Sequence, residues 1–351
     1  MKKIYLLLSL ALISLSCSSG QQNPKQNSND NTLYPIAFYN VENLFDTERD
    51  LSIMDEDFTP GGRYKWDNDK YQKKLNNLAY VISRLGKDKS PEGFAILGVA
   101  EVENRKVMED LIDTGDLSGK NYGIVHEDSP DGRGIDVGLI YNPQIFTVTN
   151  HKIYPYTLIG GTPYKTRDIL VVSGTLAGEP VSILVNHWPS RRGEDSEPLR
   201  ERAASICKHI SDSIYKADPQ TGIIIMGDMN DDPEDKSTRI ALGAKKLESE
   251  VQEGGLFNTM WQLHESGLGS LQYRGKWNLF DQIIISQSLL DKGKSKLNFI
   301  EAGIYNEDYL IQQSGNYQGY PLRTFSGNTF LNGYSDHFPT LIYLGKNKNT
   351  K

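Results

Sequence analysis

A short apolar strand followed at once by a polar loop is the pattern that most constrains this chain. Ile223–Met226 is an apolar run, mostly β-branched and too short for a helix, which indicates a buried strand, and Asp228 and Asn230 follow it closely. Five other strand-like runs also carry polar side chains at one end: Asn40 with Glu42, Glu101, Asn186 with His187, Asp281, and Asp336 with His337. Such similar strand ends predict one metal-dependent site.

These residue types match the requirements of phosphate-ester hydrolysis. The reaction needs a hard cation held by oxygen atoms, a base that orients water, and donors for the charge that develops on the phosphoryl oxygens. Asp and Glu can supply the first two, and Asn and His can supply the donors. Glu101 ends a wholly apolar run, where an unpaired carboxylate would be costly, so we expect a cation beside it.

The order of these polar motifs resembles that of the endonuclease/exonuclease/phosphatase superfamily, the deoxyribonuclease-I-like enzymes. Along the chain the order is Asn-x-Glu, Glu, Asn-His, Gly-Asp-x-Asn, Asp and Ser-Asp-His, and it extends from Tyr34 to Leu344. Within the superfamily the chain is most similar to the secreted bacterial nuclease-like enzymes. The segments that carry this likeness are 41–46 (VENLFD), 101–104 (EVEN), 133–138 (RGIDVG) and 186–191 (NHWPSR).

The resemblance and the pattern of elements together predict an α/β (α+β) fold. We expect a four-layer α/β sandwich, in which two mixed β-sheets pack face to face with helices outside. Helical spacing of apolar residues predicts a helix over 67–85, capped by Asp67, and another over 200–215 that buries Cys207. The polar segment 290–332 is expected to form a loop at the mouth of the site. Strands are expected at 36–39, 94–99, 135–141, 169–175, 181–185, 222–226, 280–286 and 339–344.

The resemblance also implies a role for each polar residue at the strand ends. The catalytic residues would be His187, Asp228, Asn230, Asp281, His337 and Asn40. The metal ligands would be Glu101, Glu42 and Asp336. The ion would be Mg²⁺, or Mn²⁺, with Ca²⁺ as a further candidate. Glu103 would lie on the opposite strand face, at the surface or behind the ligands.

The same resemblance gives an outline of the reaction. Asp228, held by Asn40 and Asn230, would orient a water molecule for in-line attack on the phosphorus, without a covalent intermediate. The pair of His337 and Asp281, together with His187, would stabilise the transition state and assist the leaving oxygen. Which histidine acts as acid and which as base stays open at this point.

Four further side chains are candidates for contact with a substrate: Arg133, Arg167, Arg191 and Tyr273. Arginine can bind phosphate and tyrosine can stack on a base. Scattered surface Arg and Tyr are, however, usual on any protein.

Less specific interpretations exist for the same residues. Asp228 and Asn230 could cap a helix that begins near Pro233, and a lone histidine beside a strand is more often structural than catalytic. The loop also reads Asp-x-Asn-x-Asp, the opening of a helix-loop-helix calcium site. Pro233 and Arg239 stand where that motif needs Gly and Glu, which excludes it.

The N-terminus is typical of a processing signal. Lys2 and Lys3 precede an apolar run from Ile4 to Leu15, and Cys17 follows. This predicts a lipoprotein signal peptide over 1–17 with lipidation at Cys17, an ordinary secretory signal being the alternative. The polar segment 18–33 would be a flexible tether, and 34–345 a single domain. The protein would then be an extracytoplasmic bacterial membrane lipoprotein, in the periplasm or at the cell surface, with only a lipid anchor in the membrane.

Composition bounds the substrate without fixing it. The 351 residues carry a net charge of −7, and the isoelectric point near 5.5 weakens non-specific attraction to nucleic acid. We expect an endonuclease that acts on DNA or RNA. The alternatives are a phosphatase or phospholipase-C-like phosphodiesterase acting on a lipid or inositol phosphate, and an inactive binding lipoprotein. No protein partner is evident, and a monomer is expected.

Overall fold

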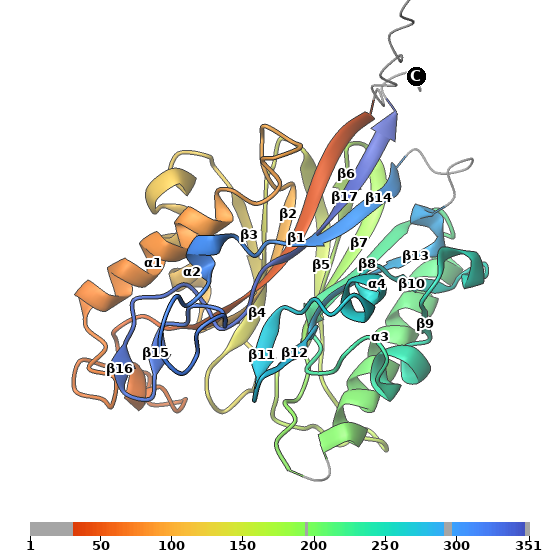
Figure 1. Cartoon of the computed structure of the whole chain (residues 1–351). Helices are drawn as coiled ribbons and strands as arrows, with labels where there is room; N and C mark the ends of the chain where they lie inside the picture. The colour runs from red at the N-terminus through yellow and green to blue at the C-terminus, as the bar shows by residue number, and fades with distance from the viewer. Residues whose placement is uncertain (1–30, 194–195, 291–296, 348–351) are drawn as a thin grey trace, which may run out of the picture. The chain divides into compact units, whose positions relative to one another are not determined.

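Two large mixed β-sheets form the body of the domain (Figure 1). The computed structural model describes residues 31–193, 196–290 and 297–347. The first sheet has the order β14 (Leu297–Ile304), β17 (Thr340–Asn347), β1 (Asn31–Leu44), β2 (Ile96–Val102), β4 (Asp136–Tyr141), β3 (Gly123–His126). The second has the order β5 (Phe146–Tyr154), β6 (Ile169–Leu176), β7 (Glu179–His187), β8 (Gly222–Asp228), β13 (Asp281–Ser286), β10 (Leu256–Asn258), β9 (Ala244–Lys245).

Helices cover the outer faces of the sheets. Helices α1 (Asn68–Ile82) and α2 (Arg105–Ile112) bury their apolar residues against the first sheet, and α3 (Ser196–Ala217) packs on the second (Figure 1). Asp67 caps α1 by accepting a hydrogen bond from the Lys70 amide. The short helices are α4 (Trp261–Glu265), the 3₁₀ turns Glu56–Phe58, Gly115–Leu117, Glu248–Glu250, Gln287–Leu289 and Asp308–Leu310, and the π turn Ser237–Ala241. The four-layer prediction is confirmed.

Alternation along the central strands explains the sandwich. In β1, Ile36 and Phe38 point into the core between the sheets, whereas Ala37 and Tyr39 point toward the helices. Strand β8 follows the same rule, with Ile224 facing the opposite sheet. Both faces of each central strand are therefore buried, which accounts for their continuous apolar sequences.

The structure corrects three expectations about the elements. Segment 290–332 is not one loop, because β14 within it pairs with β17 as an edge strand. Strand β1 begins at Asn31, so residues 31–33 of the predicted tether belong to the sheet. Strands β3, β5, β9 and β10 and the two hairpins β11 (Leu271–Tyr273) with β12 (Lys276–Asn278) and β15 (Phe325–Ser326) with β16 (Thr329–Phe330) were not expected.

The predicted signal peptide, Cys17 and most of the tether lie outside the described residues. Within the described part, every helix is too short or too polar to serve as a membrane span.

Candidate active site

Three polar residues form a row across the second sheet. In the parallel pair β7–β8, His187 lies opposite Asp228, and in the antiparallel pair β8–β13, Asp228 lies opposite Asp281. Their side chains therefore emerge side by side at one end of the sheet, because directly paired residues point to the same face. All three are buried. The register of three strands thus assembles half of the predicted catalytic group.

The first sheet brings its residues to the same place through irregular backbone. Asn40 follows the alternation of β1 and points inward, but Glu42 and Asn43 have φ angles of 52° and 49°. Glu101 has a φ of 64°, and the register of β2 shifts at this residue. Without this bulge, Glu101 would alternate toward the helices. Left-handed backbone at non-glycine residues is costly, and its concentration here is typical of a functional site.

Asp228 is the common neighbour within the site. Its Oδ2 accepts a hydrogen bond from Asn40 Nδ2 at 3.1 Å, and its Oδ1 accepts one from the Asn230 amide at 2.9 Å. The Asn230 side chain instead donates to the Trp188 carbonyl. Burial, together with the charge of Asp281, raises the pKa of Asp228 to about 6, although His337 works in the opposite direction. Asn40 holds this carboxylate through its side chain, as predicted, whereas Asn230 holds it only through its backbone N–H.

His337 and Asp281 form the predicted pair. His337 Nδ1 lies 2.6 Å from Asp281 Oδ2, and its Nε2 lies 3.9 Å from Asp228 Oδ2. Ser335 helps to position the ring, because its hydroxyl accepts from the His337 amide and donates to the Asn40 carbonyl. Burial alone would lower the pKa of His337, but Asp281 and Asp228 outweigh it and hold that pKa well above its usual value.

His187 has the opposite electrostatic environment. Its Nε2 lies 3.6 Å from Asp228 Oδ2 and 4.0 Å from Glu101 Oε1. Burial, followed by the positive charges of Arg167 and Arg133, holds the pKa of His187 well below its usual value. The ring is therefore neutral at pH 7, whereas that of His337 is protonated.

The donor set suits a divalent cation. Asp228, Asp281 and His337 each offer one ligand atom, and these three atoms lie within 4.8 Å of one another. Glu101 also lies beside His187, with Oε2 accepting from the Asn43 backbone amide and Oε1 4.0 Å from His187 Nε2. Asp228 and Asp281 from the second sheet and Glu101 from the first bring three carboxylates to one site, and their combined negative charge favours a cation, so the residues fit the metal that the sequence predicts. Metal ligation by Glu101 itself stays a prediction.

Glu42 and Asp336 belong to a charged network that adjoins the catalytic residues through Asp336, whose Oδ1 lies 3.9 Å from His337 Nε2. Both carboxylates pair with Arg323, and Glu42 Oε2 also accepts from the Thr324 amide at 2.7 Å. The ammonium of Lys74 is buried 3.9 Å from Glu42, and burial lowers the pKa of Lys74 to about 8. The structure thus turns Glu42 toward the 323–324 segment and not toward Glu101. Direct metal contacts of Glu42 and Asp336 stay predictions. The contacts of Glu42 with Arg323 and Thr324, which hold the 323–324 segment in place, were not predicted from the sequence.

Lys74 and Arg323 were missed by the sequence analysis. Lys74 lies one helical turn from Tyr71 and Leu78 on the apolar face of α1, where a lysine is out of place. A lysine on an apolar helix face indicates a buried carboxylate nearby, so this position could have been recognised from the sequence. Arg323 lies in a polar segment without periodicity, and nothing in the local sequence distinguishes it from a surface arginine.

The predicted substrate-binding arginines have different surroundings. Arg167 is buried and donates to Asp131 and to the carbonyls of His187 and Trp188, so it positions the His187 backbone. Its burial corrects the expectation that Arg167 is available for contact with a substrate. Arg191 pairs with a cluster of carboxylates, Asp231, Asp232 and Asp235. Arg133 is partly exposed beside Asp131.

Tyr273 is the most exposed of the predicted substrate contacts. It lines a cavity of about 410 Å³ together with Arg274, Tyr317, Tyr320, Arg323 and Asp336, among others. The guanidinium carbon of Arg274 lies over the Tyr273 ring, 5.2 Å from the ring centre. The cavity adjoins the active site through Asp336, whose Oδ1 is 3.9 Å from His337 Nε2. An aromatic and cationic wall therefore borders the catalytic residues.

Three other expectations can be compared with the structure. Asp228 and Asn230 cap no helix, because residues 229–236 form turns and the next helical segment starts at Ser237. Cys207 is fully buried on α3, as predicted, and burial raises the pKa of its thiol to about 12. Glu103 is not a surface group: it is buried and accepts a hydrogen bond from the Asp46 amide.

Comparisons with known proteins agree with this architecture. No curated protein matches the chain. Among solved structures, TDP2 of D. rerio in complex with a single-strand DNA product is 11% identical, with a TM-score of 0.54 over 89% of this chain and 99% of that one. A mannosyl-6-phosphatase of Bacteroides thetaiotaomicron is 15% identical, with a TM-score of 0.53 over 89% and 99%. At such identities these likenesses show the fold.

An endonuclease/exonuclease/phosphatase family protein of Bacteroides thetaiotaomicron has a TM-score of 0.54 and 15% identity over 92% of this chain and 98% of its own. The sequence comparison is more specific. The model of the endonuclease/exonuclease/phosphatase family matches residues 35–346, which span both sheets and every site residue described above. Members of this family hydrolyse phosphoester bonds and generally use a divalent metal. The chain therefore belongs to the endonuclease/exonuclease/phosphatase family.

Proposed function

We propose that this protein is a metal-dependent phosphodiester hydrolase that cleaves DNA or RNA. The observation that carries the proposal is the pair of buried histidines on either side of Asp228. His187 Nε2 and His337 Nε2 lie 3.6 Å and 3.9 Å from the same Asp228 oxygen. Their environments drive the two pKa values in opposite directions. Such a division is how one site provides both an acid and a base.

The protonated ring of His337 is the group that can donate a proton to the leaving oxygen. Asp281 fixes its orientation through Nδ1 and stabilises its charge. Asp228, raised to a pKa of about 6, is the group that can accept a proton from water and orient it. The neutral His187 can accept a hydrogen bond without adding charge. A bound Mg²⁺ or Mn²⁺, held by Glu101 with the neighbouring carboxylates, would polarise the phosphate.

The cavity beside Asp336 supports a nucleic-acid substrate. The exposed ring of Tyr273 can stack on a base, and the adjacent guanidinium of Arg274 can bind a phosphate. The family likeness to the D. rerio protein bound to a DNA product is in keeping with this choice. The second candidate is phosphomonoester hydrolysis, which the likeness to a mannosyl-6-phosphatase supports. We also propose that the enzyme acts outside the cytoplasm, anchored through Cys17.

Hydrolysis assays test this proposal. Protein lacking residues 1–20 is incubated with Mg²⁺ or Mn²⁺, and then with chelator, against plasmid DNA, RNA, sphingomyelin, an inositol polyphosphate and mannose 6-phosphate. We expect chelator-sensitive cleavage of DNA or RNA that falls at least about 100-fold in His337→Ala, the scale of lost general acid catalysis. His151→Ala is the matched control, because His151 is exposed and lies outside the site.

The alternatives have distinct outcomes. Turnover of only the lipid, inositol or sugar phosphate would keep the site and replace the substrate. No turnover of any substrate by folded protein would favour a binding lipoprotein without activity. Cleavage that survives both chelator and His337→Ala would contradict the mechanism itself.

A further inference from the structure

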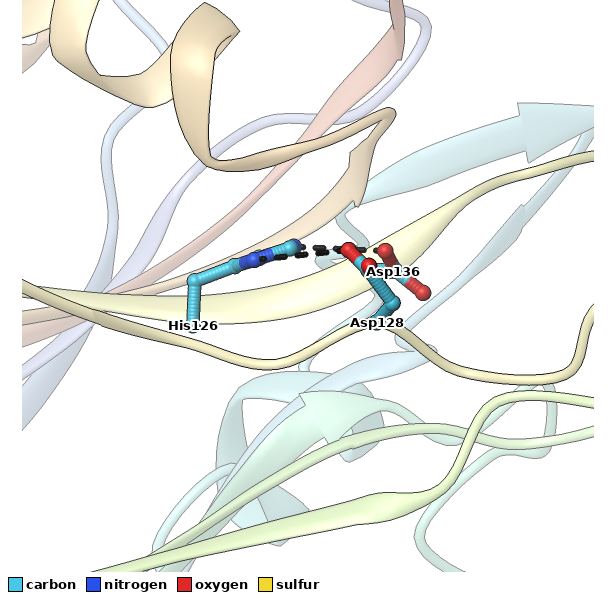
Figure 2. A group of neighbouring side chains, drawn as sticks. All are labelled: His126, Asp128 and Asp136. Carbon is cyan, nitrogen blue, oxygen red and sulfur yellow. Dashed lines mark ion pairs between the residues drawn. The ribbon is translucent and has the colours of Figure 1, made fainter. Parts of the chain in front are cut away.

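A second group of metal-ligating side chains lies at the β3–β4 hairpin. His126 ends β3, Asp136 begins β4, and Asp128 lies in the loop between them (Figure 2). Each residue offers one ligand atom, and the three atoms lie within 4.8 Å of one another. His126 Nε2 is 3.2 Å from Asp136 Oδ2, and His126 Nδ1 is 3.9 Å from Asp128 Oδ1. Figure 2 shows the imidazole pointing toward both carboxylates.

The imidazole has no hydrogen-bonding partner for one of its nitrogens. The His126 side chain is 2% exposed, and its buried Nε2 makes no hydrogen bond, although Asp136 Oδ2 lies 3.2 Å away. Leaving such an atom unsatisfied costs stability, and it calls for an occupant. Asp136 presents Oδ2 to the same point, because its Oδ1 is occupied by the Ser129 amide at 2.8 Å. Burial also raises the pKa of Asp136.

This cluster is separate from the active site. Val125 and Val137 point into the core between the sheets, so their neighbours His126 and Asp136 point to the opposite, outer face of the first sheet. Asp128 and Asp136 line a cavity of about 700 Å³ there. Its wall carries six carboxylates and two cationic side chains: Asp46, Glu48, Asp50, Glu103, Asp128, Asp136, Arg49 and Lys106. The excess of negative charge favours a cation.

We propose that His126, Asp128 and Asp136 bind a second divalent ion, of the transition-metal class and best matched by Zn²⁺. One imidazole and two carboxylates are ordinary zinc ligands, and water would complete the coordination. Ligand atoms at about 2.0–2.2 Å from an ion, at tetrahedral angles, lie about 3.3 Å apart, close to the observed 3.2 Å between His126 and Asp136. Asp128 is 87% exposed, so its side chain is free to complete the site.

Such an ion would link the two ends of the 127–135 loop. Asp131 in this loop pairs with Arg167 at 2.8 Å, and Arg167 in turn donates to the His187 carbonyl. Fixing the two ends of the loop would thus hold Asp131 in place. The ion itself lies outside the hydrolytic centre, and the proposal is independent of the substrate and of the reaction assigned to the protein.

Calorimetric titration with Zn²⁺ tests the site directly. Metal-free protein carrying His337→Ala is used as the background, because this change breaks the Asp228, Asp281 and His337 cluster that could also take the ion. We expect one Zn²⁺ per chain in this background, and loss of that binding when His126→Gln is added. Asp128→Asn should weaken it at least 10-fold. His151→Gln is the matched control, because this nearby exposed histidine faces Glu127 and not the cluster.

Two outcomes would overturn the proposal. One is the absence of Zn²⁺ binding in the background protein, and the other is unchanged affinity in both His126→Gln and Asp128→Asn. If His126→Gln prevents folding, the exposed Asp128→Asn variant decides alone. As a second readout, crystals grown with Zn²⁺ should give an anomalous scattering peak between His126 and Asp136 at the zinc edge. A peak only beside Asp228 would exclude the site.

Discussion

Asp281 favours the protonated form of His337, one of the two histidines beside Asp228. It lies 2.6 Å from His337 Nδ1 and stands at the β13 end of the row formed by the paired strands, so its position is fixed by the sheet. Loss of this carboxylate would remove the largest contribution that offsets burial, and would therefore lower the pKa of His337 and favour its neutral form. The acid of the proposed mechanism therefore depends on a residue that need not touch the substrate.

The isosteric change Asp281→Asn tests this dependence. The imidazolium form of His337 persists up to a raised pKa in the native protein, so activity that needs it is lost only at alkaline pH. In the variant that loss should begin at lower pH, and kcat at pH 8 should fall at least about 100-fold. A pH–rate profile measures both effects, with the exposed Asp69→Asn as control. A profile identical to that of the native protein would refute the role of Asp281.

The residues at strand ends could be predicted from sequence because each follows a recognisable apolar run. Asn40, Asp228 and Asp281 meet where the prediction places them. The direction of Glu42 could not be predicted, because two left-handed residues interrupt the alternation of β1 at that point. Arg167 was misplaced for another reason: its three hydrogen bonds go to partners distant in sequence, and local sequence carries no record of them.

At the scale of elements, the close approach of β7 and β8 determines the site. Gly227 precedes Asp228 and pairs with Asn186, which precedes His187. A Cβ atom at Gly227 would lie within 2.7 Å of both the carbonyl oxygen and the Cβ of Asn186. Backbone cannot move away as a flexible side chain would, so only glycine permits this spacing.

Gly227→Ala should therefore separate the two strands. We expect a loss of about 1–3 kcal/mol in the free energy of unfolding, the usual range for overpacking, with a further fall in activity because His187 and Asp228 are displaced. Urea unfolding and the nuclease assay measure the two effects. Gly61→Ala is the matched control, since a Cβ there meets nothing within 4 Å. Equal stability of the two variants would contradict this account.

The elements that were predicted are the central ones. Strands buried on both faces have continuous apolar sequences, and α1 has clear helical spacing. Strand β5 was missed because it is an edge strand whose residues 150–152 are all exposed. Strand β14 was missed because its neighbours in sequence are polar and its residues are only partly buried. Edge strands are defined by their partner, and sequence pattern alone does not reveal them.

At the scale of the whole molecule, the acidic cavity makes stability depend on pH. Burial, with the charges of Asp46 and Asp55, raises the pKa of Glu103 to about 8, above its value in the unfolded chain. A carboxyl group of this kind stabilises the fold while it is protonated. That contribution is complete below the unfolded pKa and disappears as the pH rises through about 8.

Glu103→Gln should remove this dependence. Between pH 5 and 8.5 the native protein should lose up to about 4 kcal/mol of unfolding free energy through this group, and the variant should lose less. Urea unfolding at both pH values, in chelator so that no cation enters the cavity, measures the difference. Glu109→Gln, an exposed change on α2, should behave as the native protein. The same pH dependence in all three proteins would rule out Glu103 as its source.

The two ends of β1 lie at opposite ends of the domain: one is where the chain enters the sheet, and the other contributes Asn40 to the catalytic cluster. The chain enters the strand at Asn31, beside the last residues of β17, and reaches the catalytic cluster at Asn40. Nine residues of strand separate these points, a distance of about 30 Å at 3.3 Å per residue. Whatever precedes Asn31 is therefore joined to the domain at the far end from the chemistry. A long polymer can approach Asp228 and Tyr273 without passing the point of attachment.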